Sequence, residues 1–108
     1  MNDLKAVYEQ GEDAQILDVR ELDEWNAGRI ERAVHLPLNA LMAGWEEGRL
    51  DKSKPVYVVC RSGNRSELAS LMLRARGYDA HNMEGGMQAW ESEGLPFSAV
   101  DGGPGQVA

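Results

Sequence analysis

The only cysteine in the sequence, Cys60, begins the heptapeptide CRSGNRS and is followed by Arg61 and Arg65. The thiolate is the nucleophilic form of cysteine, and nearby positive charge or backbone N–H donors lower the pKa at which it forms. Gly63 permits a tight backbone curve that turns N–H groups inward, and Asn64 tolerates a left-handed conformation. The heptapeptide therefore predicts an anion cradle around a reactive sulfur, with the pKa of Cys60 below the usual value of about 8.5.

The elements on either side of this loop would position the sulfur. The run VYVVC, residues 56–60, is typical of a strand buried on both faces. The segment SELASLMLRARG, residues 66–77, predicts a helix that Ser66 caps and Gly77 ends, and a helix N-terminus favours anions. Because open α/β sheets bind ligands at the carboxyl ends of their strands, Cys60 lies where a site is expected. The competing interpretation is a cysteine that only packs in the core.

Strands and helices alternate along the whole chain. Strands are expected at residues 15–19, 33–37, 56–60 and 78–83, and helices at residues 3–10, 20–28, 38–48, 66–77 and 84–94. This alternation predicts an α/β fold with a central parallel sheet and helices on both faces. Asp3 is a candidate cap for the first helix.

Several apolar residues are expected in the core. Leu38, Leu41, Met42 and Trp45 would form one apolar stripe on a helix. The three tryptophans are interpreted as core aromatics: Trp25, Trp45 and Trp90.

Composition excludes several classes of function. A chain of 108 residues predicts one domain, and its net charge of −7 argues against binding to nucleic acid or to an anionic membrane. No apolar run approaches the ~18 residues of a membrane span, and the N-terminus lacks a signal-peptide pattern. One cysteine cannot form an internal disulfide, and His35 and His81 show no metal-ligand spacing. We therefore expect a cytoplasmic protein without a metal or another cofactor.

The cysteine loop, residues 60–66, resembles the active-site loop of the rhodanese family of sulfurtransferases. Residues 16–39, ILDVRELDEWNAGRIERAVHLPLN, resemble the first signature of that family, and residues 77–90, GYDAHNMEGGMQAW, resemble its closing segment. The resemblance implies a rhodanese-like fold. We expect a single rhodanese domain at residues 1–100 and a flexible, Gly-rich tail at residues 101–108.

The resemblance also implies a chemistry for the loop. A rhodanese cysteine takes a sulfane sulfur from thiosulfate or a persulfide donor, becomes a persulfide, and passes the sulfur to cyanide or a thiol. Cys60 would be the sulfur carrier. The residues that would bind the donor are Arg61, Ser62, Gly63, Asn64, Arg65 and Ser66. Expected partners are a small anionic donor, a cyanide or thiol acceptor and, as a further candidate, a sulfur-relay protein.

Two charged residues at the end of the first strand, Asp18 and Arg20, form the Asp-x-Arg pattern that supports the loop in this family. One hypothesis is that Asp18 pairs with Arg61 and orients it, and the alternative is an ordinary surface salt bridge. Glu24 is placed one helical turn from Arg20 and is expected to pair with it.

Two other features are interpreted as structural. His35 is expected to be a hydrogen-bonded residue at the end of a strand. Gly85 and Gly86 either form a turn or allow a close approach to the site, and the turn is the favoured interpretation.

Three alternatives to thiosulfate sulfurtransferase activity remain. Dual-specificity phosphatases of a related fold and arsenate reductases use a cysteine loop, but those phosphatases have Cys-x5-Arg, whereas Cys60 and Arg65 form Cys-x4-Arg. Val59 stands where those phosphatases commonly carry histidine. A non-catalytic binding module usually lacks the cysteine. A persulfide carrier for a biosynthetic partner would share the same loop.

Overall fold

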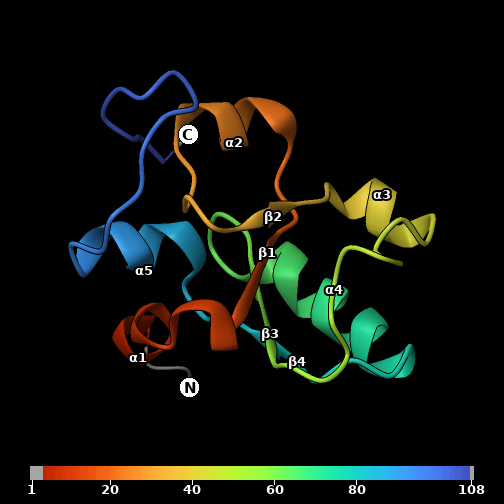
Figure 1. Ribbon diagram of the computed structural model, residues 1–108. Helices are drawn as coiled ribbons and strands as arrows, with labels where there is room; N and C mark the ends of the chain where they lie inside the picture. The colour runs from red at the N-terminus through yellow and green to blue at the C-terminus, as the bar shows by residue number, and fades with distance from the viewer. Residues whose placement is uncertain (1–3, 108) are drawn as a thin grey trace.

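The computed structural model describes residues 4–107, apart from the side chain of residue 12, and shows one parallel sheet between helices (Figure 1). The strands are β1 (Gln15–Asp18), β2 (Val34–His35), β3 (Val56–Val59) and β4 (Ala80–Asn82), in the spatial order β2-β1-β3-β4. The helices are α1 (Leu4–Glu9), α2 (Leu22–Ala27), α3 (Leu38–Met42), α4 (Asn64–Ala75) and α5 (Gly86–Ser92), with a 3-10 turn, η1, at Gly11–Asp13. The predicted α/β fold is confirmed, whereas the proposed cap Asp3 lies outside the described residues.

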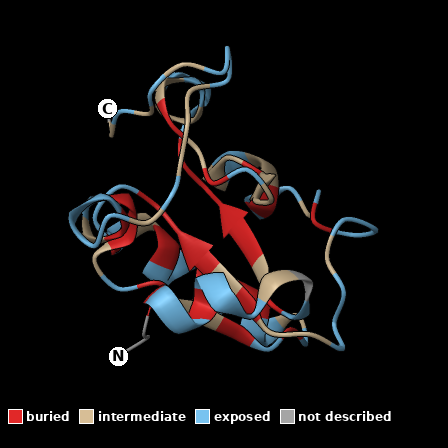
Figure 2. Ribbon diagram, turned by 60° about the vertical axis from the view of Figure 1, so that its left-hand side comes forward, coloured by how far each residue is buried: buried red, intermediate tan, exposed pale blue. Residues whose placement is uncertain are grey.

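The pleat of the strands divides the core between two faces of the sheet. In β1, Leu17 packs in a cluster that includes Leu73 of α4, whereas its neighbour Ile16 packs in a second cluster with Val7 of α1 and Trp90 of α5. Successive side chains of a strand point to opposite faces, so one short strand supplies both clusters. Buried residues follow the strands, and exposed residues lie on the outer sides of the helices (Figure 2). Helices therefore cover both faces, as the sequence predicted.

Helix α4 begins earlier than the sequence indicated. Its first residue is Asn64, and Gly63 precedes it with a φ of +112°, in the left-handed region. The prediction that Ser66 caps this helix was wrong, because Gly63 already turns the chain into the helix. Asn64 was also expected to accommodate a left-handed conformation, but no described residue other than glycine has a positive φ.

The apolar stripe predicted after β2 is interrupted. Helix α3 ends at Met42, and Gly44, with a φ of +83°, turns the chain away. As a result Met42 and Trp45 are 58% and 66% exposed, so the expectation that Trp45 belongs to the core was wrong. Trp90 is fully buried as predicted, and Trp25 is partly buried and stacks on the His35 ring.

The C-terminal segment lies against the end of helix α2 (Figure 1). The backbone N–H groups of Val100 and Gln106 donate to the carbonyls of Asn26 and Ala27, at 3.1 Å and 2.9 Å. Val107 packs on the core cluster that contains Trp90. The flexibility expected of residues 101–108 stays a prediction, because contacts report position and not motion.

The burial difference between two tryptophans predicts very different costs of removing them. Trp90→Ala should lower the free energy of unfolding by about 3–5 kcal/mol, because it empties a buried site and removes the donor to the Pro96 carbonyl. Trp45→Ala should change it by less than about 0.5 kcal/mol. Urea unfolding of the two variants beside the native protein measures both values. Equal costs would contradict this assignment of the core.

Candidate active site

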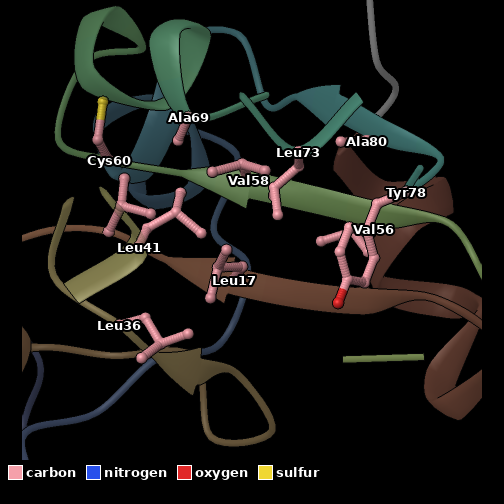
Figure 3. Close-up of a cluster of buried hydrophobic side chains, with 11 residues drawn as sticks. Leu17, Leu36, Leu41, Val56, Val58, Cys60, Ala69, Leu73, Tyr78 and Ala80 are labelled. Carbon is pink, nitrogen blue, oxygen red and sulfur yellow. The ribbon is translucent and has the colours of Figure 1, made fainter. Parts of the chain in front are cut away.

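Cys60 directly follows β3 at the carboxyl edge of the sheet. Its side chain is 1% exposed and packs in the core cluster on the α3 and α4 face. The sulfur lies beside the chain that leads from β3 into α4 (Figure 3). Cys60 therefore packs in the core, as one sequence interpretation expected, and it also lies against the start of a helix, whereas its reactivity stays a prediction.

The loop supplies the sulfur with hydrogen-bond donors. The N–H of Gly63 donates to the Cys60 Sγ at 3.0 Å, and the Ser66 Oγ lies 3.4 Å from it. Ser66 is fully buried in the first turn of α4, so its hydroxyl faces the sulfur from the start of the helix. The predicted cradle is therefore formed by backbone amides and one hydroxyl.

These contacts determine the acidity of the thiol. Burial raises the pKa of Cys60, but the Ser66 hydroxyl and the backbone N–H groups of Ser66, Gly63 and Ser62 outweigh it, so that the pKa is below its ordinary value. The predicted direction of the pKa agrees. The main cause differs, because hydrogen-bond donors come first, but the charge of Arg65 does interact with the Cys60 thiolate, as the sequence predicted.

Arg65 is joined to helix α2. Its Nη1 and Nη2 donate to Oε1 and Oε2 of Glu24 at 2.7 Å and 2.8 Å, a bidentate pair. The hydrogen bond from Arg65 lowers the pKa of Glu24 against the opposing effect of burial, and the bond to Glu24 raises that of Arg65. The expectation that Glu24 pairs with Arg20 was wrong, since its carboxylate reaches across to α4.

Glu24 also takes part in the start of α2. Glu21 and Glu24 form a capping box, in which the carboxylate of Glu24 accepts from the backbone N–H of Glu21. The ion pair with Arg65 therefore ties the first turn of α2 to the first turn of α4.

Asp18 and Arg20 form a buried pair at the end of β1. The Arg20 Nη2 donates to Asp18 Oδ2 at 2.7 Å and to the carbonyl of Gly28 at 2.6 Å, and both side chains are almost completely buried. The hypothesis that Asp18 pairs with Arg61 was wrong, as was the alternative of a surface salt bridge. The two-residue spacing lets the Arg20 side chain fold back onto Asp18, whose Oδ1 also accepts from the Arg20 backbone N–H.

Arg61 is the free cation of the loop. Its side chain is exposed, and within residues 4–107 it has no hydrogen-bond or ion-pair partner. His35 is hydrogen-bonded through Nε2 to the carbonyl of Arg20 at 2.9 Å, which agrees with the structural role expected of it.

The first turn of α5 also holds the loop. The N–H groups of Met87 and Gln88 donate to the carbonyls of Cys60 and Arg61, at 2.8 Å and 3.0 Å. A Cβ on Gly86 would collide with the Cys60 carbonyl oxygen. The sequence favoured a turn at Gly85 and Gly86 over a close approach to the cysteine loop. The structure shows both, because the two glycines form a left-handed turn and Gly86 packs against the backbone of the loop.

Asn82, the last residue of β4, contacts the loop through both ends of its amide. Its Nδ2 donates to the Gly63 carbonyl at 3.2 Å, and its Oδ1 accepts from the Ser66 hydroxyl at 2.5 Å. Sequence reasoning missed both Asn82 and the role of Glu24. A polar residue at the carboxyl end of a predicted strand was the available signal for Asn82.

The described residues contain no group of three or more His, Cys, Asp or Glu side chains arranged to hold a metal ion. Within the same residues, no helix has the length and apolar character that crossing a membrane requires.

Comparison with known proteins identifies the same family that the cysteine loop resembles. The model of the rhodanese-like domain matches residues 1–93. The chain belongs to this family of sulfurtransferases. YtwF of Bacillus subtilis is 40% identical over 93 residues, covering 86% of this chain and 88% of that protein. Thiosulfate sulfurtransferase GlpE of Pseudomonas syringae is 34% identical over 99 residues, covering 91% and 89%.

Solved structures show the same relationship. A rhodanese-related protein from Thermoplasma volcanium superimposes with a TM-score of 0.77 at 35% identity, over 85% of this chain and 90% of that chain. The predicted family and the rhodanese-like fold are therefore both confirmed.

The Glu24–Arg65 pair in this rhodanese domain should make stability depend on acidic pH. Because the pKa of Glu24 is lowered from 4.5 in the folded protein, its contribution is present above 4.5 and is lost as pH falls through the lowered value. Glu24→Gln should destabilise the domain at neutral pH by less than about 1 kcal/mol, since the Arg65 side chain is partly exposed to solvent. Urea unfolding between neutral pH and pH values below 4.5 measures the difference, which should shrink toward the acid end.

Glu9→Gln is the matched control for this experiment. Glu9 faces Lys5 at 4.0 Å with both side chains well exposed, so its replacement should have little effect at any pH. A cost of Glu24→Gln that stays constant with pH would contradict the role assigned to the ion pair.

Proposed function

We propose that this rhodanese domain transfers a sulfane sulfur from thiosulfate or a persulfide donor to cyanide or a thiol, through a persulfide on Cys60. The observation that carries the proposal is the set of donors directed at the sulfur, from the Gly63 N–H and the Ser66 hydroxyl. The same donors that favour the thiolate are placed to stabilise the negative charge of a persulfide. The GlpE relative, named a thiosulfate sulfurtransferase, supports thiosulfate as donor.

The two half-reactions balance without a cofactor. The Cys60 thiolate attacks the outer sulfur of thiosulfate, a new S–S bond forms, and sulfite leaves with the electron pair of the bond that breaks. Cyanide then attacks the outer sulfur of the persulfide, and thiocyanate forms as the thiolate departs. Such double displacement predicts ping-pong kinetics. A thiol that must remain reduced between turnovers suits a reducing compartment, so we place the protein in the cytoplasm.

The backbone and the two arginines of the loop would contribute differently to binding of the sulfur donor. Backbone N–H groups from Arg61 to Ser66 would form the cradle, with those of Ser62, Gly63 and Ser66 already directed at the sulfur, and the exposed guanidinium of Arg61 would add an unpaired positive charge. The guanidinium of Arg65 is engaged with Glu24, so its main contribution is to hold the loop in shape. The two arginines that looked equivalent in the sequence thus have separate roles in this proposal.

Sulfur loading tests the proposed chemistry directly. Reduced protein incubated with thiosulfate should gain the mass of one sulfur atom, and cyanide should remove it with release of thiocyanate. Cys60→Ser should neither gain mass nor form thiocyanate, and should keep its fold because serine is nearly isosteric. Intact mass spectrometry and a thiocyanate assay provide the measurements.

The proposal fails if the Cys60→Ser variant retains sulfur transfer. It also fails if the native protein, with an alkylatable Cys60, accepts sulfur from neither thiosulfate nor a persulfide donor. Hydrolysis of phosphate esters or reduction of arsenate by such a protein would then favour the alternatives that share a cysteine loop.

The separate roles of the two arginines predict different kinetic effects. Arg61→Ala should raise the KM for thiosulfate by about threefold to tenfold and leave the unfolding free energy unchanged, because it removes an exposed charge without a protein partner. Arg65→Ala should lower the unfolding free energy as well, because it leaves Glu24 without its partner. Steady-state kinetics at two salt concentrations and urea unfolding measure these quantities.

Arg49→Ala removes an exposed arginine outside the cysteine loop and is the control for overall charge. The KM increase for Arg61→Ala should shrink at high salt, because screening weakens the lost attraction. An unchanged KM in this variant would mean that the backbone cradle binds the donor without help from Arg61.

A further inference from the structure

The Ser66 hydroxyl faces two acceptors and carries only one hydrogen. Its Oγ lies 2.5 Å from Asn82 Oδ1 and 3.4 Å from Cys60 Sγ. A hydroxyl donates one hydrogen bond at a time, although its hydrogen rotates readily. The shorter contact assigns the hydrogen to the amide oxygen of Asn82.

The orientation of the Asn82 amide is determined by a second contact. Its Nδ2 donates to the carbonyl of Gly63 at 3.2 Å. Because that carbonyl accepts and cannot donate, the amide oxygen has to point the other way, toward Ser66. The acceptor next to Ser66 is therefore held in place by the same loop that surrounds the sulfur.

We propose that Asn82 is a positioning residue for the reacting sulfur: its amide oxygen holds the single hydroxyl hydrogen of Ser66 while Cys60 is a thiol, and Ser66 turns that hydrogen to Sγ when the sulfur becomes an anion. Thiolate and persulfide anions then gain a hydrogen bond, which is charge-assisted and stronger than the neutral bond given up. Asn82 competes with the sulfur for this bond, and its presence limits how readily Cys60 ionises. The inference rests on the proposed role of Cys60.

The charged side chains around the sulfur act on it without a hydrogen bond, and Arg65 does so through its charge. Among residues 4–107, the hydrogen bonds to Sγ come from backbone amides and a hydroxyl and from no charged side chain. Glu24 of α2 and Arg65 of α4 form a bidentate ion pair with each other. From the end of β1, Asp18 and Arg20 form a buried pair.

The remaining charges lie at the outer side of the loop. Glu67, Arg74 and Glu84 line a hollow of about 420 Å³ that Asn82 also lines. Arg61 is exposed. Among the donors to the sulfur, the Ser66 hydroxyl is therefore the one that has a second acceptor within reach.

The ionisation of Cys60 tests this competition. Because the chain has a single cysteine, the ultraviolet absorbance of the thiolate, measured against Cys60→Ser as blank, reports Cys60 alone. Asn82→Leu is close in shape and removes the competing acceptor. It should lower the midpoint of ionisation, giving about threefold to tenfold more thiolate at a pH below that midpoint. Ser66→Ala should raise the midpoint, because the donor itself is lost.

The double variant separates competition from support of the loop. If Asn82 acts through the Ser66 hydrogen, Asn82→Leu should have no effect on the midpoint in a Ser66→Ala background. A rise of the midpoint with Asn82→Leu in both backgrounds would overturn the proposal and leave Asn82 as an anchor of the Gly63 carbonyl. An unchanged midpoint in both backgrounds would also overturn it. Asn82→Ala removes the same acceptor with less bulk and should lower the midpoint as well, which keeps the test available if the leucine variant unfolds.

The result of this experiment is independent of the result of the sulfur-loading test. The ionisation of Cys60 is measured without a sulfur donor, so an altered midpoint stands whether or not the protein accepts sulfur from thiosulfate. A protein that loads sulfur normally but shows no downward shift in the Asn82 variants would retain the proposed function and lose the inference about Asn82.

Discussion

The hydrogen bond from the Gly63 N–H to the Cys60 sulfur places strict demands on the chain around it. It requires a turn within three residues of Cys60, directly after a buried strand, and Gly63 provides that turn with a φ of +112°. Helix α4 begins at the next residue, which brings the Ser66 hydroxyl to the same sulfur. A short loop of this kind has few contacts of its own, so its shape depends on neighbouring elements.

Three elements distant in the sequence supply that support. Helix α2 contributes the carboxylate of Glu24, α5 contributes the N–H groups of Met87 and Gln88, and β4 contributes the amide of Asn82. The carbonyls of the loop thus point outward to donors of the fold, while its own N–H groups are left for the sulfur. This division of donors and acceptors explains how a buried sulfur can hold negative charge without a cation in contact with it.

The sequence predicted the general arrangement better than the individual partners. The parallel sheet, the position of Cys60 at its edge and the direction of its pKa shift follow from local patterns: a β-branched run, a glycine and a helix. Partner choice depends on where helices cross, and Glu24 reaches Arg65 across 41 positions of sequence. Asp18 was paired with the wrong arginine because its actual partner, Arg20, folds back from two residues away inside the core. Trp45 was misplaced because Gly44 ends the helical periodicity that placed it.

The depth of the Cys60 sulfur has a consequence for regiochemistry. A persulfide has two sulfur atoms, and attack by an acceptor at the inner one would displace hydrosulfide and attach the acceptor to the protein. With Cys60 only 1% exposed, the inner sulfur of the proposed persulfide would be shielded by the loop and the core, whereas the outer sulfur would lie about 2 Å farther along the S–S bond. In the proposed reaction, steric protection of one atom and presentation of the other would direct the acceptor to the atom that is transferred. The packing that buries the cysteine would thereby protect the enzyme from being trapped as a mixed disulfide with its own acceptor.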